Sequence, residues 1–373
     1  MNSNVLKTEQ APLLKVKKKA QGRKGLIDLS QAVPGYSMPQ ELADHLKDVI
    51  SLHRENRVAF YTPDPGIPEL REKISEDECV RTGRVCKAHD ILVTAGANQA
   101  VYITVSTLFE PGSKVAVFSP YYFNHCMTLD MTGLEKIIIP PLPGTVRPDI
   151  EKLMKLHDVD GVLIVNPSNP TGYCMSREEL EQIFEFAAKR DIILISDETY
   201  QEFDKDFIPL RGISDHKNII SVKSFSKTYS MTGFRTGYIH ACSNIIEELL
   251  KVQDCNLICA PHISQLAALY CLKDLDMEWL SSKKLILENN RDLITHMLKH
   301  DRRYKILESG LFFAYLETDG DSMDITDRLI EKGVLVAPGE VFEGGRSRNI
   351  RVSTGNVSAD ILEKAISRLT DEK

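Results

Sequence analysis

The feature that most constrains the fold is a regular alternation of short apolar runs with helical patterns after residue 90. The apolar runs are rich in β-branched and aliphatic residues, as buried strands are: Ile91–Thr94, Val115–Phe118, Gly161–Val165, Ile192–Ser196, Ile219–Val222 and Gly237–His240. Helical patterns lie between several of them, notably at Asn98–Phe109 and Glu178–Lys189. The second follows a capping-box sequence that begins at Ser176. This alternation predicts an α/β fold with a mostly parallel central sheet and helices on both faces.

In the last part of the chain the regular alternation of strands and helices ends, which indicates a second, smaller α+β domain. Helical patterns and short strands are expected at Leu285–Leu298, Leu311–Leu316, Val334–Val336 and Ser358–Leu369. With 373 residues, the chain also exceeds the usual ~100–200 residues of one domain. We expect an N-terminal arm at 1–27, a large domain at 51–263, and a small domain at 28–50 and 264–373. A (β/α)₈ barrel is the weaker alternative, because the number of predicted strands and the loss of alternation near the C-terminus do not suit it.

Composition excludes several classes of function. The chain has 46 Lys plus Arg against 53 Asp plus Glu, and a net charge of -7 disfavours general nucleic-acid binding. No stretch of ~18 apolar residues predicts a membrane span. The eight cysteines form no Cys-x-x-Cys pair and no His-Glu-x-x-His occurs, so no metal site is expected. Without a signal-peptide pattern, we expect a cytoplasmic protein with reduced thiols, and a solvated basic arm at Leu14–Lys24.

Polar and aromatic residues follow the predicted strands at the edge where open α/β sheets bind ligands. They are Ala95-Gly96-Ala97-Asn98-Gln99, Ser119-Pro120-Tyr121-Tyr122, Asn166-Pro167-Ser168-Asn169-Pro170-Thr171-Gly172, Asp197-Glu198-Thr199-Tyr200, and Ser224-Phe225-Ser226-Lys227 with Gly233-Phe234-Arg235. Taken singly, each is more often structural: a tight turn, a helix cap or a solvated surface residue. Together they offer a helix N-terminus, phenols, an amide, a carboxylate, a lysine and an arginine. This set suits an anionic, aromatic cofactor that carries an electrophilic carbon.

The segment 224–237 resembles the lysine signature of the class I/II aminotransferases, enzymes of fold type I that depend on pyridoxal 5'-phosphate (PLP). Other motifs of that family occur in the same order: Tyr61-Thr62-Pro63-Asp64-Pro65-Gly66 with Leu70-Arg71, the Asn-Pro-x-Asn-Pro-Thr-Gly and Asp-Glu-x-Tyr motifs, and Ile350-Arg351-Val352-Ser353. The likeness runs from about Asp28 to the C-terminus. It implies the PLP-transferase fold and exchange of an amino group between an L-amino acid and a 2-oxo acid.

The resemblance also implies roles for single residues. Lys227 matches the lysine that forms a Schiff base with the PLP aldehyde, and Asp197 the carboxylate that faces the pyridine nitrogen. Asn169 and Tyr200 match the residues that hydrogen-bond the phenolate oxygen, and Tyr122 the ring that stacks on the pyridine. Lys227, Asp197 and Tyr200 are therefore the expected catalytic residues.

The phosphate and substrate sites are implied in the same way. The expected phosphate-binding residues are Gly96, Ala97, Asn98, Ser224 and Arg235, joined by Tyr61 from a neighbouring subunit. The chain is thus expected to be a homodimer with shared sites. Arg351 matches the arginine that binds the substrate α-carboxylate, and Ala32 and Asn169 are the other expected substrate-binding residues. Ala32 stands where many relatives have a glycine, and no second arginine matches one that reads a side-chain carboxylate, so a preference for dicarboxylic substrates stays open.

Three other functions are alternatives to the aminotransferase. A PLP-dependent lyase or decarboxylase on the same scaffold differs only in which Cα bond of the substrate is aligned with the ring. A PLP-sensing regulator needs a DNA-reading module, for which ~25 residues before the sheet domain are too few. A nucleotide-binding enzyme is disfavoured because no Gly-x-Gly-x-x-Gly occurs and Lys227-Thr228 lacks the P-loop glycines.

Overall fold

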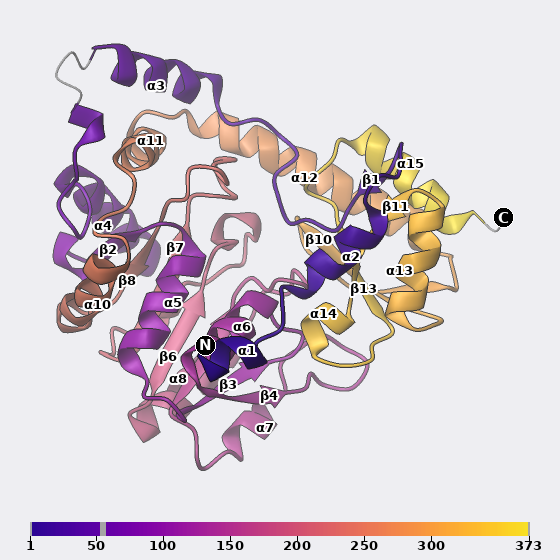
Figure 1. Ribbon diagram of the computed structural model, residues 1–373, viewed down its shortest axis with the longest axis horizontal. Helices are drawn as coiled ribbons and strands as arrows, with labels where there is room; N and C mark the ends of the chain where they lie inside the picture. Colours follow the sequence, from indigo (N-terminus) through magenta and orange to yellow (C-terminus); the bar gives the residue numbers. More distant parts are fainter. Residues whose placement is uncertain (1, 53–56, 372–373) are drawn as a thin grey trace.

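The structure is a computed structural model that describes residues 2–52 and 57–371, and its centre is a seven-stranded sheet (Figure 1). The strands are β2 (Ile91–Thr94), β3 (Lys114–Phe118), β4 (Glu135–Ile139), β5 (Gly161–Val165), β6 (Ile193–Asp197), β7 (Ile219–Ser224) and β8 (Gly237–His240). Their order is β2-β8-β7-β6-β5-β3-β4, and β8 alone runs in the opposite direction to the other six strands. The predicted strands and the mostly parallel sheet are confirmed. β4 was not predicted, because this edge strand is only partly buried and opens on Glu135 and Lys136.

Helices cover both faces of this sheet, as predicted. Alternate residues of β5 show why: Leu163 joins one apolar cluster with residues of α5, whereas Val162 and Ile164 join another with residues of α8. The helices of this part are α3 (Gln40–Leu52), α4 (Pro68–Thr82), α5 (Ala97–Leu108), α6 (Phe123–Thr132), α7 (Ile150–Met154), α8 (Arg177–Arg190), α9 (Leu210–Ile213), α10 (Ser243–Asn256) and α11 (His262–Lys273). Short 3₁₀ turns are η1 (Arg57–Ala59), η2 (Ala88–Asp90) and η3 (Gln201–Phe203). The predicted capping box of α8 is present at Ser176 and Glu179.

The C-terminal part builds a second, antiparallel sheet of order β12-β13-β10-β9. Its strands are β9 (Tyr304–Ser309), β10 (Phe313–Thr318), β12 (Ala337–Pro338) and β13 (Asn349–Ser353), beside the parallel pair β1 (Ile27–Asp28) and β11 (Val334–Leu335). The helices are α12 (Met277–Leu298), α13 (Ser322–Glu331), α14 (Glu340–Glu343) and α15 (Ala359–Thr370). Leu316, Val352 and Leu362 belong to the apolar core of this part.

The division into domains stays a proposal. Pairing of β1 with β11 joins residues 27–28 to the C-terminal part, whereas α11 packs on α4 beside the large sheet. Met1, residues 53–56 of the expected large domain and residues 372–373 of the small one lie outside the described residues. All eight cysteines are free thiols. Among the described residues, no helix combines the length and the apolar character that crossing a membrane requires.

The N-terminal arm differs from its prediction. It forms α1 (Ser3–Lys7) and α2 (Pro12–Ala20), and α2 lies across the body of the protein (Figure 1). Val16 and Ala20 are buried against Ile330 and Leu335, because residues four apart share one face of a helix. The expectation of a solvated arm was therefore wrong for this face of α2.

Candidate active site

A cavity of about 410 Å³ opens at the carboxyl ends of β5, β6 and β7, beside the start of α5. Most of the predicted site residues line it: Ala32, Ala97, Asn98, Tyr122, Asn169, Asp197, Tyr200, Ser224, Lys227, Arg235 and Arg351. Parallel pairing explains this convergence, because Val165 ends β5 directly opposite Asp197, the last residue of β6. Gly96 stands beside the cavity as the N-cap of α5. Tyr61 does not line it, and its side chain is 76 % exposed.

Asp197 supplies a buried negative charge. Its side chain is almost inaccessible, its Oδ1 accepts a hydrogen bond from the Thr199 N–H at 3.0 Å, and its Oδ2 lies 3.0 Å from Nε2 of His125. Burial alone would raise the pKa of Asp197, but His125 and Thr199 outweigh it and hold this pKa below its ordinary value. Sequence reasoning missed His125. The available signal was its place in the first turn of a helix that follows a strand end.

Lys227 supplies an amine whose pKa is lower than that of an ordinary lysine. Its Nζ donates a hydrogen bond to the Ala32 carbonyl at 2.6 Å. Burial and the nearby charges of Arg235 and Arg351 lower the pKa of Lys227 to about 8, against the opposing effect of Asp197. A much larger fraction of this amine than of an ordinary lysine is therefore neutral and nucleophilic near neutral pH.

Arg351 supplies a buried positive charge. Its Nη1 donates to Oδ1 of Asn169 at 2.7 Å and its Nη2 donates to the Ser30 carbonyl. The guanidinium lies 4.8 Å from the ring centroids of both Phe313 and Phe342. Burial lowers the pKa of Arg351 to about 10, and its Nε has no hydrogen-bond partner among the described residues. A carboxylate entering the cavity would satisfy this cation.

An anion site lies where α5 begins. Gly96 adopts φ +81°, and a Cβ at this position would stand 2.7 Å from Nη2 of Arg235. That guanidinium donates to the Thr232 carbonyl at 3.0 Å and remains exposed. The free N–H groups of the helix N-terminus, Arg235 and the nearby Ser224 hydroxyl together suit a phosphate dianion.

Two phenols complete the wall. The Tyr122 ring stands edge-on to His125 at a centroid distance of 5.1 Å, and the Tyr200 ring packs edge-on against Phe312 and Phe313. Burial raises the pKa of both tyrosines, so each keeps its proton and can donate it to an anionic oxygen.

These groups fit PLP. A buried carboxylate suits the pyridine nitrogen, the helix N-terminus with Arg235 suits the phosphate, and a lysine of lowered pKa suits the aldehyde. The shared cavity is large enough for the coenzyme and a small amino acid.

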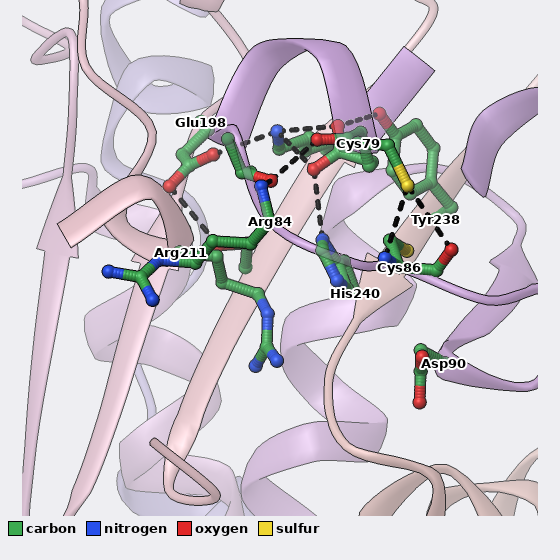
Figure 2. Close-up of polar contacts among 12 residues, drawn as sticks. Cys79, Arg84, Cys86, Asp90, Glu198, Arg211, Tyr238 and His240 are labelled. Atoms are coloured by element: carbon green, nitrogen blue, oxygen red, sulfur yellow. Dashed lines mark hydrogen bonds and ion pairs between the residues drawn. The ribbon is translucent and has the colours of Figure 1, made fainter. Parts of the chain in front are cut away.

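A buried charge network, which the sequence did not predict, lies among residues that do not line the cavity (Figure 2). The Glu78 carboxylate, from α4, accepts hydrogen bonds from Lys223 Nζ at 2.7 and 2.9 Å and from the Tyr238 hydroxyl at 2.9 Å. It also lies 2.9 Å from Nδ1 of His240. Lys223 lies 3.1 Å from Oε2 of Glu198, and the charged side chains of the two glutamates and the lysine are fully buried.

The network is tied to the active site through the chain itself. Lys223 directly precedes Ser224, and Glu198 directly follows Asp197. Oε1 of Glu198 also accepts the Leu210 N–H at 2.9 Å. The network thus connects α4 with the ends of β6 and β7, which carry cavity-lining side chains.

Comparisons with known proteins show the family of this chain. The sequence model of the family described as "Aminotransferase class I and II" matches residues 24–369. The aromatic aminotransferase ISS1 of Arabidopsis thaliana is 32 % identical over 359 residues, which are 92 % of this chain and 88 % of that protein. The aspartate aminotransferase of Pyrococcus abyssi is 29 % identical over 94 % of this chain and 92 % of its own.

Solved structures are similar over the whole length. The aspartate aminotransferase of Thermotoga maritima superposes with a TM-score of 0.92 at 26 % identity. A double mutant of the Thermus thermophilus aspartate aminotransferase gives a TM-score of 0.91 at 25 % identity. In both cases the match covers 99 % of this chain and 98 % of the other.

Proposed function

Because this chain belongs to the class I and II aminotransferase family and has the fold of these enzymes, we propose that it uses PLP to exchange an amino group between an L-amino acid and a 2-oxo acid. The observation that carries the proposal is one cavity lined by the Lys227 amine, the Asp197 carboxylate and the Arg351 guanidinium. The relatives compared above are named aminotransferases, which disfavours the lyase or decarboxylase alternative.

We assign the coenzyme-binding residues by their chemistry. When bound, PLP supplies a protonated ring that accepts the electrons released at the substrate Cα. Asp197, kept ionised by His125, would hold the proton on the ring nitrogen. Arg235, Ser224 and the start of α5 would bind the phosphate, while Asn169 and Tyr200 would bind the phenolate oxygen. Tyr122 would cover the ring face.

The substrate is positioned by Arg351. Its guanidinium binds the α-carboxylate in a bidentate pair, which limits rotation about the Cα–N bond. The Lys227 amine would hold the coenzyme covalently, and the same lysine amine, once free, would take a proton from the substrate Cα. The lowered pKa of Lys227 suits both tasks.

We further propose that two copies of the chain share their active sites. Tyr61 and its neighbour Phe60 are 76 % and 64 % exposed in the single chain, so both are available to a partner. Tyr61 would then reach the phosphate bound by the other subunit. A cytoplasmic location also remains a prediction.

The test is reconstitution with PLP followed by a panel of amino donors. Visible absorbance should appear on reconstitution, and a suitable donor should convert the coenzyme stoichiometrically to its amine form. Lys227→Ala should bind PLP without the covalent link and without turnover, whereas exposed Lys205→Ala should behave as wild type. Normal transamination by Lys227→Ala would overturn the proposal. Release of CO₂ or of an elimination product without the amine form would establish the lyase or decarboxylase.

A further inference from the structure

Helix α2 contributes one wall of the candidate active site. Its buried face, Val16 and Ala20, is anchored on the C-terminal part of the protein. On the same helix, Leu13 and Leu14 lie four and three residues before Lys17, so each shares a face with it, and all three line the cavity. The N-terminal arm therefore places a cation at the site.

The charges of the cavity wall are unbalanced. Among the described residues that line it, Lys17, Lys227, Arg235 and Arg351 are basic and Asp197 alone is acidic. The proposed function uses Arg235 for the phosphate, Lys227 for the coenzyme aldehyde and Arg351 for the α-carboxylate. Lys17 is the remaining cation, and it has no role in binding the coenzyme or the α-carboxylate.

Lys17 is free to change partner. Its Nζ lies 3.5 Å from Oδ2 of Asp28, with the two side chains 26 % and 39 % exposed. A long, partly exposed ion pair of this kind contributes little to stability. Asp28 does not depend on it, because its Oδ1 also accepts the N–H of Ser30 at 2.8 Å and the hydroxyl of Ser30 at 2.6 Å. An anion in the cavity can therefore draw Lys17 away without leaving Asp28 unpartnered.

The same contacts connect Lys17 to the α-carboxylate site. Asp28 holds Ser30, and the Ser30 carbonyl accepts a hydrogen bond from Arg351. Lys17 and Arg351 thus stand at the two ends of one chain of polar contacts, and both line the cavity. The apolar side chains of Leu13 and Leu14 line the same wall as Lys17 and suit the methylene groups of a substrate.

We propose that Lys17 is a specificity-determining residue that binds the distal carboxylate of a dicarboxylic amino acid or 2-oxo acid, an inference that rests on the proposed function. Arg351 binds one end of such a substrate and Lys17 the other. The sequence has no second arginine that matches one binding a side-chain carboxylate. Lys17, from the N-terminal arm, would take that role and give a preference for dicarboxylic substrates.

The test compares ligands that differ only in the distal carboxylate. The PLP-reconstituted protein is assayed with 2-oxoglutarate and with 2-oxopentanoate, an acceptor of the same carbon number. Lys17→Met should lower kcat/KM for 2-oxoglutarate by roughly 10–100-fold, through KM, as loss of a charge-assisted contact predicts. The value for 2-oxopentanoate and kcat should stay within about twofold, Lys17→Arg should retain most of the preference, and exposed Lys18→Met should match wild type.

Binding of the non-reacting pair glutarate and pentanoate, measured by calorimetry, keeps the inference separate from the proposed function. Absence of turnover together with a glutarate preference that disappears in Lys17→Met overturns the proposed function and supports the role of Lys17. Equal losses for both ligands in Lys17→Met would assign Lys17 to packing of α2. Either that result or a preference unchanged by Lys17→Met overturns the inference.

Discussion

Replacement of Lys223 by methionine tests how the buried network supports the active-site strands. The change removes an ammonium that lies 2.7 and 2.9 Å from the oxygens of Glu78 and 3.1 Å from Glu198. Methionine is similar in length, so the lost charge dominates over any cavity. Removing one partner of a buried ion pair costs about 3–5 kcal/mol, because the remaining charge stays in a medium of low polarity. We expect the free energy of unfolding to fall by that amount.

Urea unfolding followed by circular dichroism and by the fluorescence of the single tryptophan, Trp279, measures this loss. With an m-value of about 3 kcal/mol/M, the midpoint should move down by roughly 1–2 M. Lys251→Met is the control, because it breaks an exposed pair with Glu248 and should change stability by less than about 0.5 kcal/mol. Adding Glu78→Gln to Lys223→Met should recover part of the loss, since it removes an uncompensated charge.

The pH dependence gives a second check. Burial raises the pKa of Glu78, but Lys223 and His240 outweigh it, so this pKa lies well below its ordinary value. A depressed carboxyl pKa stabilises the protein above the pKa of the unfolded chain, and this contribution is lost as the pH falls below about 4–5. The difference between wild type and Lys223→Met should therefore shrink at acid pH. A midpoint for Lys223→Met equal to that of Lys251→Met would refute the reasoning.

Three further predictions follow from single features of the site. The rate at which coenzyme-free protein captures PLP should rise with pH around a midpoint of about 8, the pKa of Lys227, and a midpoint near the ordinary lysine value would contradict the assignment. Arg351→Lys should lower kcat/KM for the amino donor by roughly 10–100-fold in steady-state assays, because lysine cannot form the bidentate pair. Gly96→Ala should weaken PLP binding in a titration, since its Cβ would meet Arg235, whereas Gly112→Ala, also at positive φ but with open space around it, should lower only the melting temperature. Equal PLP affinity in the two alanine variants would count against the phosphate site.

Strands and their ends were readable from the sequence because their physics is local. A run such as Val162 to Ile164 alternates between two apolar clusters, and period-two burial leaves a recognisable pattern of aliphatic residues. Parallel strands also end at one edge, so residues that follow them, such as Asp197 and Lys227, were expected to meet. Recognition of the family motif then connected Arg351, far away in the sequence, to the same site.

Other features depended on contacts between distant segments. No local pattern distinguishes His125 from other helix residues or Lys223 from other strand residues. Only folding places His125 against Asp197 and Lys223 against Glu78. Lys17 belonged to a basic stretch that charge pattern alone assigned to solvent. Burial of one side of α2 turned this residue toward the cavity.

The sequence by itself determined the class of fold, the edge of the sheet that binds ligands and the kinds of groups gathered there, because hydrophobic periodicity and chain direction are properties of neighbouring residues. Only the tertiary structure decided which charges are buried, which are paired and which face the cavity. Solvation and Coulomb energies depend on distances between residues such as Lys17 and Asp28 or Lys223 and Glu78, and these distances exist only after the chain has packed.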